Sequence, residues 1–399
     1  MIHRNGSHPS ALSRGTRNVA RRRGLRGALC ATVLALTVAF ALTGVEATTP
    51  LASAATGLYS YPISGASFGV SSPIHVVTFY GSDFTVKIGL AHNTIDGGEE
   101  TPSAMCQRTS GCVAAVNGDF FDVTRPGKPD PGDEVGGIIR NCVLMHTPEI
   151  SHQQVDIDGE SVSNSFNWTS ALDVNGTSVP ITAINQELPM SYVGVNVPLK
   201  GTLLFTAPYA LKTPTGRGRS TYEFVDVGGT ASPTTINATA ELKYVGQTAQ
   251  AIRVTAGRVD ISAPVGSALA TLAVGSTLSI TTDSTSGCDN IGGSPILLDD
   301  GVVEPTNPAD TYLAAPFART VIGWTASDET VIMTVGGVDG REGATWSQLD
   351  AILQSLDVET ALDLDGGTST TLYANGHLVY PTARSERLVS TSLLVVQNQ

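Results

Sequence analysis

The chain has 399 residues, of which 41% are hydrophobic and 15% charged, so it can build a hydrophobic core and does not have the composition of a disordered protein. The abundance of Val, Thr, Ile, Gly and Ser favours strands and turns and excludes an all-helical bundle. The formal net charge of −13 would repel nucleic acid phosphates, and no basic stripe compensates for it, so we expect no nucleic acid partner.

Residues 1–54 have the pattern of a secretion signal. Six arginines between Arg14 and Arg26 precede an apolar run from Ala28 to Leu42, and Ala52-Ser53-Ala54 fits a small-residue cleavage site. The run has 15 residues, fewer than the roughly 20 that span a bilayer. We therefore expect the segment to be removed and no stable membrane span to remain, with a retained anchor as the alternative. Removal leaves 16 basic against 35 acidic residues. We expect the mature protein to be extracellular, and attachment to the cell wall stays open.

Cysteine usage agrees with export. Cys30 leaves with the signal, and Cys106, Cys112, Cys142 and Cys288 remain, an even number typical of an oxidising compartment. We expect two disulfides, and of the three possible connectivities we prefer Cys106 with Cys112 and Cys142 with Cys288. A zinc site is the alternative, but no CxxC pair or nearby histidine spacing supports it.

The mature chain is predicted to be one strand-rich architecture. Residues 55–73 form a Gly/Ser lead-in, strand-like alternation begins at 74–79, and the main domain extends over residues 74–397. A β-rich insertion is expected at about 150–285, where turns rich in Gly, Pro and Asn separate the apolar runs 202–206, 251–254 and 278–281.

The only strong helix signal covers Thr345 to Val358. Its apolar residues have helical spacing, and Thr345 with Gln348 forms a capping box. The sequence therefore predicts an α+β fold, a strand-rich mixed sheet with few helices.

Polar groups interrupt apolar strands at five places, which carry the candidate chemistry. The first is Asn117-Gly118-Asp119 with the residues that follow it, after the apolar strand 113–116; this pattern is typical either of an Asx-type turn or of a site. The second is the glycine pair before Pro295, where backbone N–H groups could approach an anion; the first residues of a hairpin are the alternative.

The third and fourth places contribute arginines. Arg319 lies in an interior strand, and a buried guanidinium needs an anionic partner, which is either an internal carboxylate or a substrate phosphate. Asp339 and Arg341 follow the buried-type strand 331–335, at the kind of strand end where α/β sites occur; a plain turn is the alternative.

The fifth place is predicted to put Asp363 and Asp365 on one face of a strand, before Gly366 and Gly367. Two like charges at that spacing raise one pKa unless a cation intervenes, which is costly for a simple turn. A divalent cation there stays open, but the nearby arginines make it unnecessary and no cofactor is expected.

Several common catalytic motifs are absent. The sequence has no G-x-S-x-G elbow, no P-loop and no Rossmann fingerprint, and no histidine whose position argues for a triad. Arginines, carboxylates, amides and glycine turns remain, a set suited to a sugar, a phosphate or both.

Taken in order, six motifs resemble those of the phosphodiester glycosidases. They are NGDFF at 117–121, IGGSPILLDDG at 291–301, ARTVIG at 318–323, VDGR at 338–341, LDLDGGTSTTLYANG at 362–376 and ERLVSTSLLV at 386–395. The resemblance covers most of residues 112–397 and implies a phosphodiester-glycosidase-like fold whose β-rich insertion is similar to that of bacterial members. It also implies hydrolysis of a sugar-1-phosphodiester, with release of the free sugar, N-acetylglucosamine being one candidate.

The resemblance and the chemistry of the reaction assign roles to individual residues. The predicted catalytic residues are Asp339, Asp365, Arg319 and Glu386, with Asp339 or Asp365 activating water and Arg319 stabilising the departing phosphate. The predicted substrate-binding residues are Asn117, Asp119, Thr320, Arg341, Gly366, Gly367 and Ser369. Asp363 is expected to be the structural member of its pair.

Two other functional classes stay open. One is a secreted glycan-binding or wall-associated protein that keeps the fold without turnover. The other is a conventional glycosidase, or a phosphodiesterase that cleaves the P–O bond. In each case the expected partner is a glycan, phosphorylated in the preferred interpretation.

Overall fold

The computed structural model describes residues 51–52, 57–122, 132–149, 152–186, 201–214, 218–228, 232–305, 315–337, 342–381 and 385–399. All of them belong to one compact unit, Gly44–Gln399. The α-helices of this described part are α1 (Pro102–Gln107) and α2 (Trp346–Ser355), and all the other long elements are strands. The predicted strand-rich α+β class is confirmed. None of the helices described is long and apolar enough to cross a membrane.

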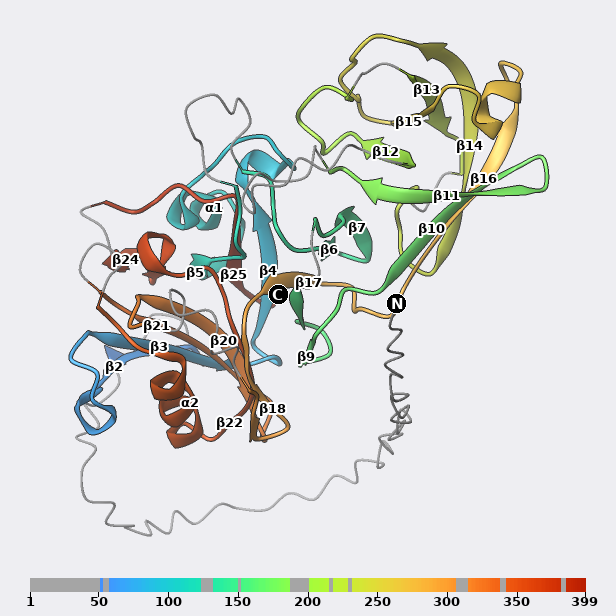
Figure 1. Ribbon diagram of the computed structural model, residues 1–399. Helices are drawn as coiled ribbons and strands as arrows, with labels where there is room; N and C mark the ends of the chain where they lie inside the picture. Colours follow the sequence, from blue (N-terminus) through green and yellow to red (C-terminus); the bar gives the residue numbers. More distant parts are fainter. Residues whose placement is uncertain are drawn as a thin grey trace, which may run out of the picture. The chain divides into compact units, whose positions relative to one another are not determined.

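An eight-stranded antiparallel sheet carries the C-terminal motifs. Its order is β1 (Leu51–Ala52), β2 (Tyr59–Ile63), β3 (Ile74–Tyr80), β21 (Glu329–Val335), β20 (Arg319–Thr325), β22 (Val358–Asp363), β18 (Ile296–Asp299) and β19 (Val302–Val303). Helix α2 lies against β18 and β22 (Figure 1). Leu349, Ile352 and Leu353 are fully buried in the cluster that joins the helix to this sheet.

The predicted helix is confirmed with its capping box. The Thr345 hydroxyl accepts from Gln348 N, and the Gln348 side chain accepts from Thr345 N, which satisfies two N–H groups that a helix start leaves unpaired. The helix ends at Ser355, earlier than predicted, and Asp357 follows with a positive φ of 58°.

Two five-stranded sheets carry the motifs that begin at residues 117 and 291. One has the order β24 (His377–Pro381), β23 (Thr371–Ala374), β5 (Cys112–Asn117), β25 (Thr391–Gln397) and β4 (Phe84–Leu90). The other has the order β7 (Val143–His146), β6 (Ile138–Arg140), β17 (Asn290–Gly293), β8 (Gln153–Asp156) and β9 (Ser161–Ser163). Both therefore combine strands that are far apart in the sequence.

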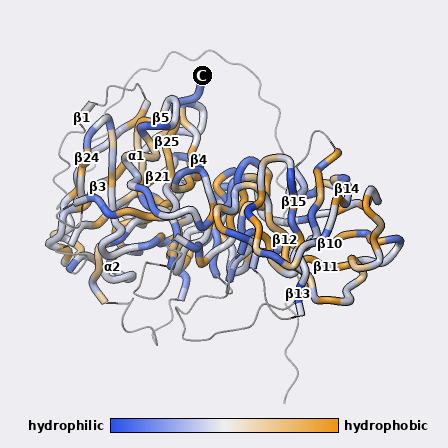
Figure 2. Tube along the Cα trace, turned by 90° about the horizontal axis from the view of Figure 1, so that it is seen from above, coloured by the Kyte–Doolittle hydropathy of each residue, from blue (hydrophilic) through white to orange (hydrophobic). Residues whose placement is uncertain are grey.

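Seven strands of the central part of the chain close into a barrel. They are β10 (Trp168–Val174), β11 (Thr177–Ile184), β12 (Thr202–Thr206), β13 (Arg219–Asp226), β14 (Ala238–Thr248), β15 (Arg258–Pro264) and β16 (Thr277–Ser284). Hydrophobic and hydrophilic segments alternate along these strands (Figure 2), as expected when successive side chains face the interior and solvent in turn. The apolar face fills the barrel with its own hydrophobic core.

Two details differ from the sequence prediction. Residues Tyr59–Ile63, inside the expected lead-in, pair with β3 and so extend the eight-stranded sheet. The run 251–254 is not a strand: Arg253 makes only an isolated bridge to Lys212, because Ile252 exchanges hydrogen bonds with Thr213 and fastens a loop.

Both preferred disulfides are confirmed. Cys106–Cys112 links α1 to β5 over six residues. Cys142–Cys288 links the turn before β7 to the segment before β17, across a sequence separation of 146 residues that includes the whole barrel.

Candidate functional site

Asn117, the last residue of β5, joins three segments of the chain. Its Oδ1 accepts from the Thr320 hydroxyl at 2.7 Å and from Thr371 N at 3.2 Å, and its Nδ2 donates to the Asp365 carbonyl at 2.6 Å. Asn117 and Thr320 are both fully buried. The predicted binding residues Asn117 and Thr320 are therefore engaged with the protein itself and hold the first and fifth motifs together. Their contact with a substrate stays a prediction.

Asp119 follows on this turn and is paired with a histidine. Its Oδ1 accepts from Phe120 N at 2.7 Å and lies 3.0 Å from His152 Nε2, while its Oδ2 accepts from Gly136 N at 3.0 Å. The pKa of His152 is raised: burial alone would lower it, but the Asp119 carboxylate and the hydrogen bond to it together outweigh that effect. The Asp119 carboxylate thus favours the protonated form of His152.

Glycine is required beside Asp119. A Cβ on either Gly136 or Gly292 would collide with the Asp119 carboxylate, and the two glycines also lie against each other. The glycine motif at 291–295 thus allows a close approach of backbone to a carboxylate, which is one of the uses of glycine.

Asp365 lies just beyond the end of β22 and next to Asp119. Its backbone N donates to the Gly118 carbonyl at 3.1 Å, and its Oδ1 accepts from Gly366 N at 2.8 Å. Burial raises the pKa of Asp365 to about 6, and the nearby Asp119 charge adds to this rise, whereas Ser369, Arg387 and Gly366 N oppose it. A carboxyl with such a pKa exchanges protons close to physiological pH.

The amides of Gly366 and Gly367 already have partners. Gly366 N donates to Asp365 Oδ1, and Gly367 N donates to the Ala318 carbonyl at 2.8 Å. A Cβ on Gly366 would meet that same carbonyl. The glycine pair therefore fits the loop tightly against β20, and its predicted binding of substrate stays a prediction.

Arg387 is the cation of this region, and it was not assigned a role from the sequence. Its Nη1 lies 2.9 Å from the hydroxyls of both Thr368 and Ser369, and its guanidinium lies over the Phe121 ring at 5.4 Å. Ser369, a predicted binding residue, is buried and also hydrogen-bonds Asp365. We call Asp119, His152, Asp365, Ser369 and Arg387 the Asp119–Asp365 cluster.

A second acid lies behind Asp119. Glu134 is buried, with Oε1 accepting from the Ser390 hydroxyl. Burial and the Asp119 charge raise the pKa of Glu134 well above its ordinary value, although hydrogen bonds from Ser390 and Thr391 oppose the shift. Burial and the neighbouring Asp119 carboxylate therefore both favour the protonated form of Glu134.

Arg319 and Asp363 form a buried ion pair between the neighbouring strands β20 and β22. Arg319 Nη1 lies 2.9 Å from Asp363 Oδ2, which also accepts from Trp346 Nε1 at 3.0 Å. The predicted shared strand face of Asp363 and Asp365 is wrong, because β22 ends at Asp363 and the two carboxylates have different partners. The internal carboxylate, one of the two partners expected for Arg319, is present; a catalytic role for this arginine stays a prediction.

The remaining predicted residues lie outside the cluster or outside the described residues. Glu386 accepts from Ser103 N at 2.8 Å and from the Ser103 hydroxyl at 2.5 Å, at the first turn of α1. Asp339 and Arg341 lie in 338–341, outside the described residues.

Sequence reasoning missed His152, Glu134 and Arg387. His152 precedes β8 with no motif around it, so only tertiary structure brings it to Asp119. Arg387 does lie in the ERLVSTSLLV motif, so the motif comparison contained a signal that pointed to it.

The cluster combines the Arg387 guanidinium and a histidine of raised pKa with two carboxyl groups, of which Asp365 also has a raised pKa. Cations suit a phosphate, and carboxylates suit an oxocarbenium-like carbon and an attacking water. Within the described residues, no group of three or more His, Cys, Asp and Glu side chains is arranged to hold a metal ion.

Comparisons with known proteins point to one family. A family model described as phosphodiester glycosidase matches residues 227–396, a range that includes five of the six motifs. The resemblance predicted from the sequence is thereby confirmed. No curated protein matches the chain.

Solved structures show the fold. A hypothetical protein from Synechocystis has 18% identity and a TM-score of 0.64, and the match covers 86% of this chain and 62% of that one. A putative exported protein from Burkholderia pseudomallei has 18% identity and a TM-score of 0.62, and the match covers 82% of this chain and 74% of that one. The catalytic domain of zebrafish N-acetylglucosamine-1-phosphodiester alpha-N-acetylglucosaminidase, auto-inhibited by its pro-peptide, has 15% identity over 87% of this chain and 86% of that one, with a TM-score of 0.41.

Proposed function

Because residues 227–396 match the phosphodiester glycosidases, we propose that the protein is a secreted hydrolase that cleaves the bond between a sugar and the phosphate of a sugar-1-phosphodiester. The observation that carries the proposal is the convergence of Asp119, His152, Asp365 and Arg387 from three separate motifs and one loop. Two cations and two carboxylates there match the charges of an anionic substrate that develops a positive carbon.

The reaction breaks the bond between the anomeric carbon and the bridging phosphate oxygen. Water adds to that carbon and loses a proton, so the sugar leaves as a free reducing sugar. The bridging oxygen keeps the electron pair of the broken bond and stays on the phosphate, which is now a monoester of the other alcohol. A phosphate monoester is a good leaving group, so charge stabilisation matters more than protonation. In the proposal, Arg387 and protonated His152 stabilise the phosphate oxygens.

The carboxylates act on the sugar side. Asp365, with a pKa of about 6, is ionised at neutral pH and in the proposal activates water or stabilises the oxocarbenium-like carbon. Asp119 favours the charged form of His152 through the 3.0 Å contact. Glu134, whose pKa is raised by burial and by the Asp119 charge, lies behind Asp119. In the same proposal, Asp339 is a further carboxylate beside Asp365 for the sugar, and Arg341 is a further phosphate ligand beside Arg387. Both were predicted from the sequence.

The substrate class follows from the same chemistry and from the leader sequence. An N-terminal secretion pattern supports a location outside the cytoplasm, where phosphorylated glycans of walls and exopolysaccharides occur, so such a glycan is the proposed substrate. N-acetylglucosamine is the first sugar to test, because the name of the zebrafish protein specifies it for that enzyme.

The test incubates the purified mature chain with a panel of UDP-sugars and sugar-1-phosphate diesters and measures free reducing sugar. Asp365→Asn should abolish release, while Asp260→Asn, which removes a carboxyl of similarly raised pKa in the barrel, should leave it unchanged. Equal loss in both variants would indicate a general effect on folding.

Water labelled with ¹⁸O separates the proposal from a phosphodiesterase. In the proposed reaction the label enters the sugar at its anomeric carbon. Label in the phosphate would show that the P–O bond is cleaved instead. Binding of the panel with no product from any member would favour the glycan-binding alternative.

A further inference from the structure

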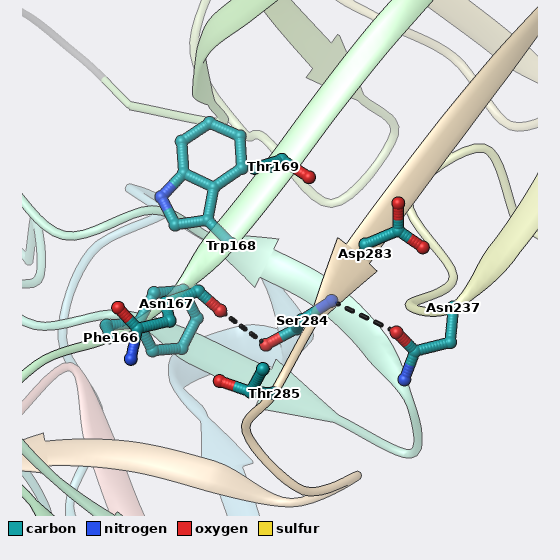
Figure 3. A pocket seen from close by; sticks show the side chains of 8 residues that line it. All are labelled: Phe166, Asn167, Trp168, Thr169, Asn237, Asp283, Ser284 and Thr285. Atoms are coloured by element: carbon teal, nitrogen blue, oxygen red, sulfur yellow. Dashed lines mark hydrogen bonds between the residues drawn. The ribbon is translucent and has the colours of Figure 1, made fainter. Parts of the chain in front are cut away.

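A pocket of about 410 Å³ opens where the barrel joins the rest of the unit. Figure 3 shows its lining at the start of β10 and the end of β16, with Ser284 between Asn167 and Asn237 and with the Trp168 and Asp283 side chains extending to different sides. The lining residues are Phe166, Asn167, Trp168, Thr169, Asn237, Asp283, Ser284 and Thr285. This volume lies within the ~300–1,000 Å³ of small-ligand sites.

The lining combines one indole with many polar groups. Trp168 is half-buried and packs on the barrel core, so its ring is fixed while part of it stays accessible. Asn167, Thr169, Asn237, Asp283 and Thr285 are exposed around it. A flat apolar ring beside carboxamides, hydroxyls and a carboxylate is suited to a saccharide, which has one apolar C–H face and a rim of hydroxyls.

Hydrogen bonds hold this lining in place without a ligand. Ser284 Oγ donates to the Asn167 carbonyl at 2.9 Å, and Ser284 N donates to Asn237 Oδ1 at 3.2 Å, as the dashed lines in Figure 3 show. Because the oxygen of Asn237 is occupied in this way, its NH₂ group is the part of the side chain that can donate to a sugar hydroxyl. Such fixed groups reduce the entropy that binding costs.

The charge of the lining selects a neutral ligand. Asp283 is its single charged residue, and no Lys, Arg or His contributes. A carboxylate repels phosphate at short range and accepts well from paired hydroxyls. The pocket therefore differs in kind from the Asp119–Asp365 cluster, where two cations favour an anion.

The pocket and the cluster are separated by two consecutive glycines. The Phe166 ring lies so close to Gly137 that a Cβ there would meet it at 2.8 Å, and the preceding residue, Gly136, donates to Asp119 Oδ2 at 3.0 Å. One lining residue of the pocket and one residue of the cluster thus contact adjacent residues of the same backbone segment.

We propose that this pocket, built on Trp168 and Asp283, binds a neutral saccharide segment of the same glycan whose sugar-1-phosphodiester occupies the Asp119–Asp365 cluster. That one glycan occupies both places rests on the proposed function. That the pocket binds a saccharide does not depend on it. The pocket thereby adds affinity for polymeric substrate through a contact remote from the reacting bond.

The test measures binding of neutral hexasaccharides of glucose, mannose, galactose or N-acetylglucosamine to the full mature chain, by calorimetry. The chain carries Asp365→Asn, so that no turnover interferes. At least one hexasaccharide should bind, and adding Trp168→Ala or Asp283→Ala should weaken its affinity by a factor on the order of ten. Tyr80→Ala, which removes an exposed aromatic ring far along the chain in β3, should leave the affinity unchanged.

The outcomes separate this inference from the proposed function. Absence of binding by every hexasaccharide, or equal binding by the parent and both pocket variants, would overturn the inference even if the wild-type chain hydrolyses phosphodiesters. Conversely, Trp168-dependent binding by a chain that hydrolyses nothing would support the saccharide pocket and contradict the proposed hydrolysis. Asp283→Ala changes an exposed residue, so the test does not depend on the folding of Trp168→Ala alone.

Discussion

His152 Nε2 lies 3.0 Å from Asp119 Oδ1, and this contact determines the charge of the cluster. The ring is nearly buried, which disfavours the imidazolium, yet the carboxylate is close enough to raise the net pKa of His152. The contact therefore favours a second cation beside Arg387 in the cluster.

The raised pKa of His152 predicts a pH-dependent stability. The folded protein holds this proton more tightly than the unfolded chain, whose histidines titrate near ~6.5. The stabilisation is therefore complete below about pH 6.5 and is lost as pH rises through the folded-state pKa. Denaturant unfolding across this range should show the loss in the wild type and not in His152→Gln. The control His377→Gln, at an exposed position, should behave as the wild type; a His152→Gln curve parallel to it would contradict the prediction.

Asp365 predicts the acidic limb of the activity profile. Its pKa of about 6 means that the carboxylate forms as pH rises through that value, so kcat/KM should rise with pH around 6. Asp365→Asn should lower kcat by roughly 10²–10⁴-fold, the usual contribution of an acid or base. In Asp260→Asn, whose wild-type carboxyl has a pKa of about 7, the limb should persist. Its disappearance there would exclude Asp365 as its origin.

The sequence was most informative where one local pattern determines the structure. Thr345 and Gln348 determined the start of α2, the even cysteine count indicated two disulfides, and period-two alternation indicated β3 and β16. The family motifs also identified Asn117, Asp119 and Asp365, which the structure brings together.

The sequence was least informative where a side chain gains its role from distant partners. A buried arginine requires an anion, but no sequence rule distinguishes Asp363 from a substrate phosphate as the partner of Arg319. His152 reaches Asp119 only because β8 pairs with β17, whose glycines leave room for the carboxylate. The run 251–254 fails as a strand because backbone partners elsewhere decide its pairing.

Arg387 predicts a loss of phosphate recognition. Arg387→Ala should lower kcat/KM for a sugar-1-phosphodiester by about 10²–10³-fold, since it removes a charged donor from the cluster. Arg387→Lys should recover little of this, because the compact ammonium lacks the planar guanidinium that lies over the Phe121 ring, even though a single nitrogen of Arg387 makes both hydroxyl contacts. Steady-state kinetics of both variants, with Arg253→Ala, at an exposed position between β14 and β15, as control, test this. Full activity of Arg387→Lys would show that charge alone suffices.

The Arg319–Asp363 pair predicts a stability effect that can be separated from catalysis. Removing one partner leaves the other charge buried, so Arg319→Met or Asp363→Leu should each destabilise the fold by about 3–5 kcal/mol. The double variant should lose clearly less than the sum, because no unpaired charge remains. Thermal and urea unfolding measure this. If folded Arg319→Met is as stable as the wild type but inactive, the arginine acts in catalysis and the buried pair is not its main role.

The two disulfides should differ in their effect on stability because they close loops of different length. Cys142–Cys288 spans 146 residues, and Cys106–Cys112 spans six. Loop-closure entropy then gives about 5 kcal/mol for the first and about 2 kcal/mol for the second. Unfolding of the paired variants Cys142→Ser with Cys288→Ser and Cys106→Ser with Cys112→Ser compares them. Since the long loop contains the barrel, whose folded core already restricts that loop, a partly folded barrel in the denatured state would reduce the first value. Equal destabilisation by the two paired variants would therefore indicate that the barrel folds on its own before the rest of the unit.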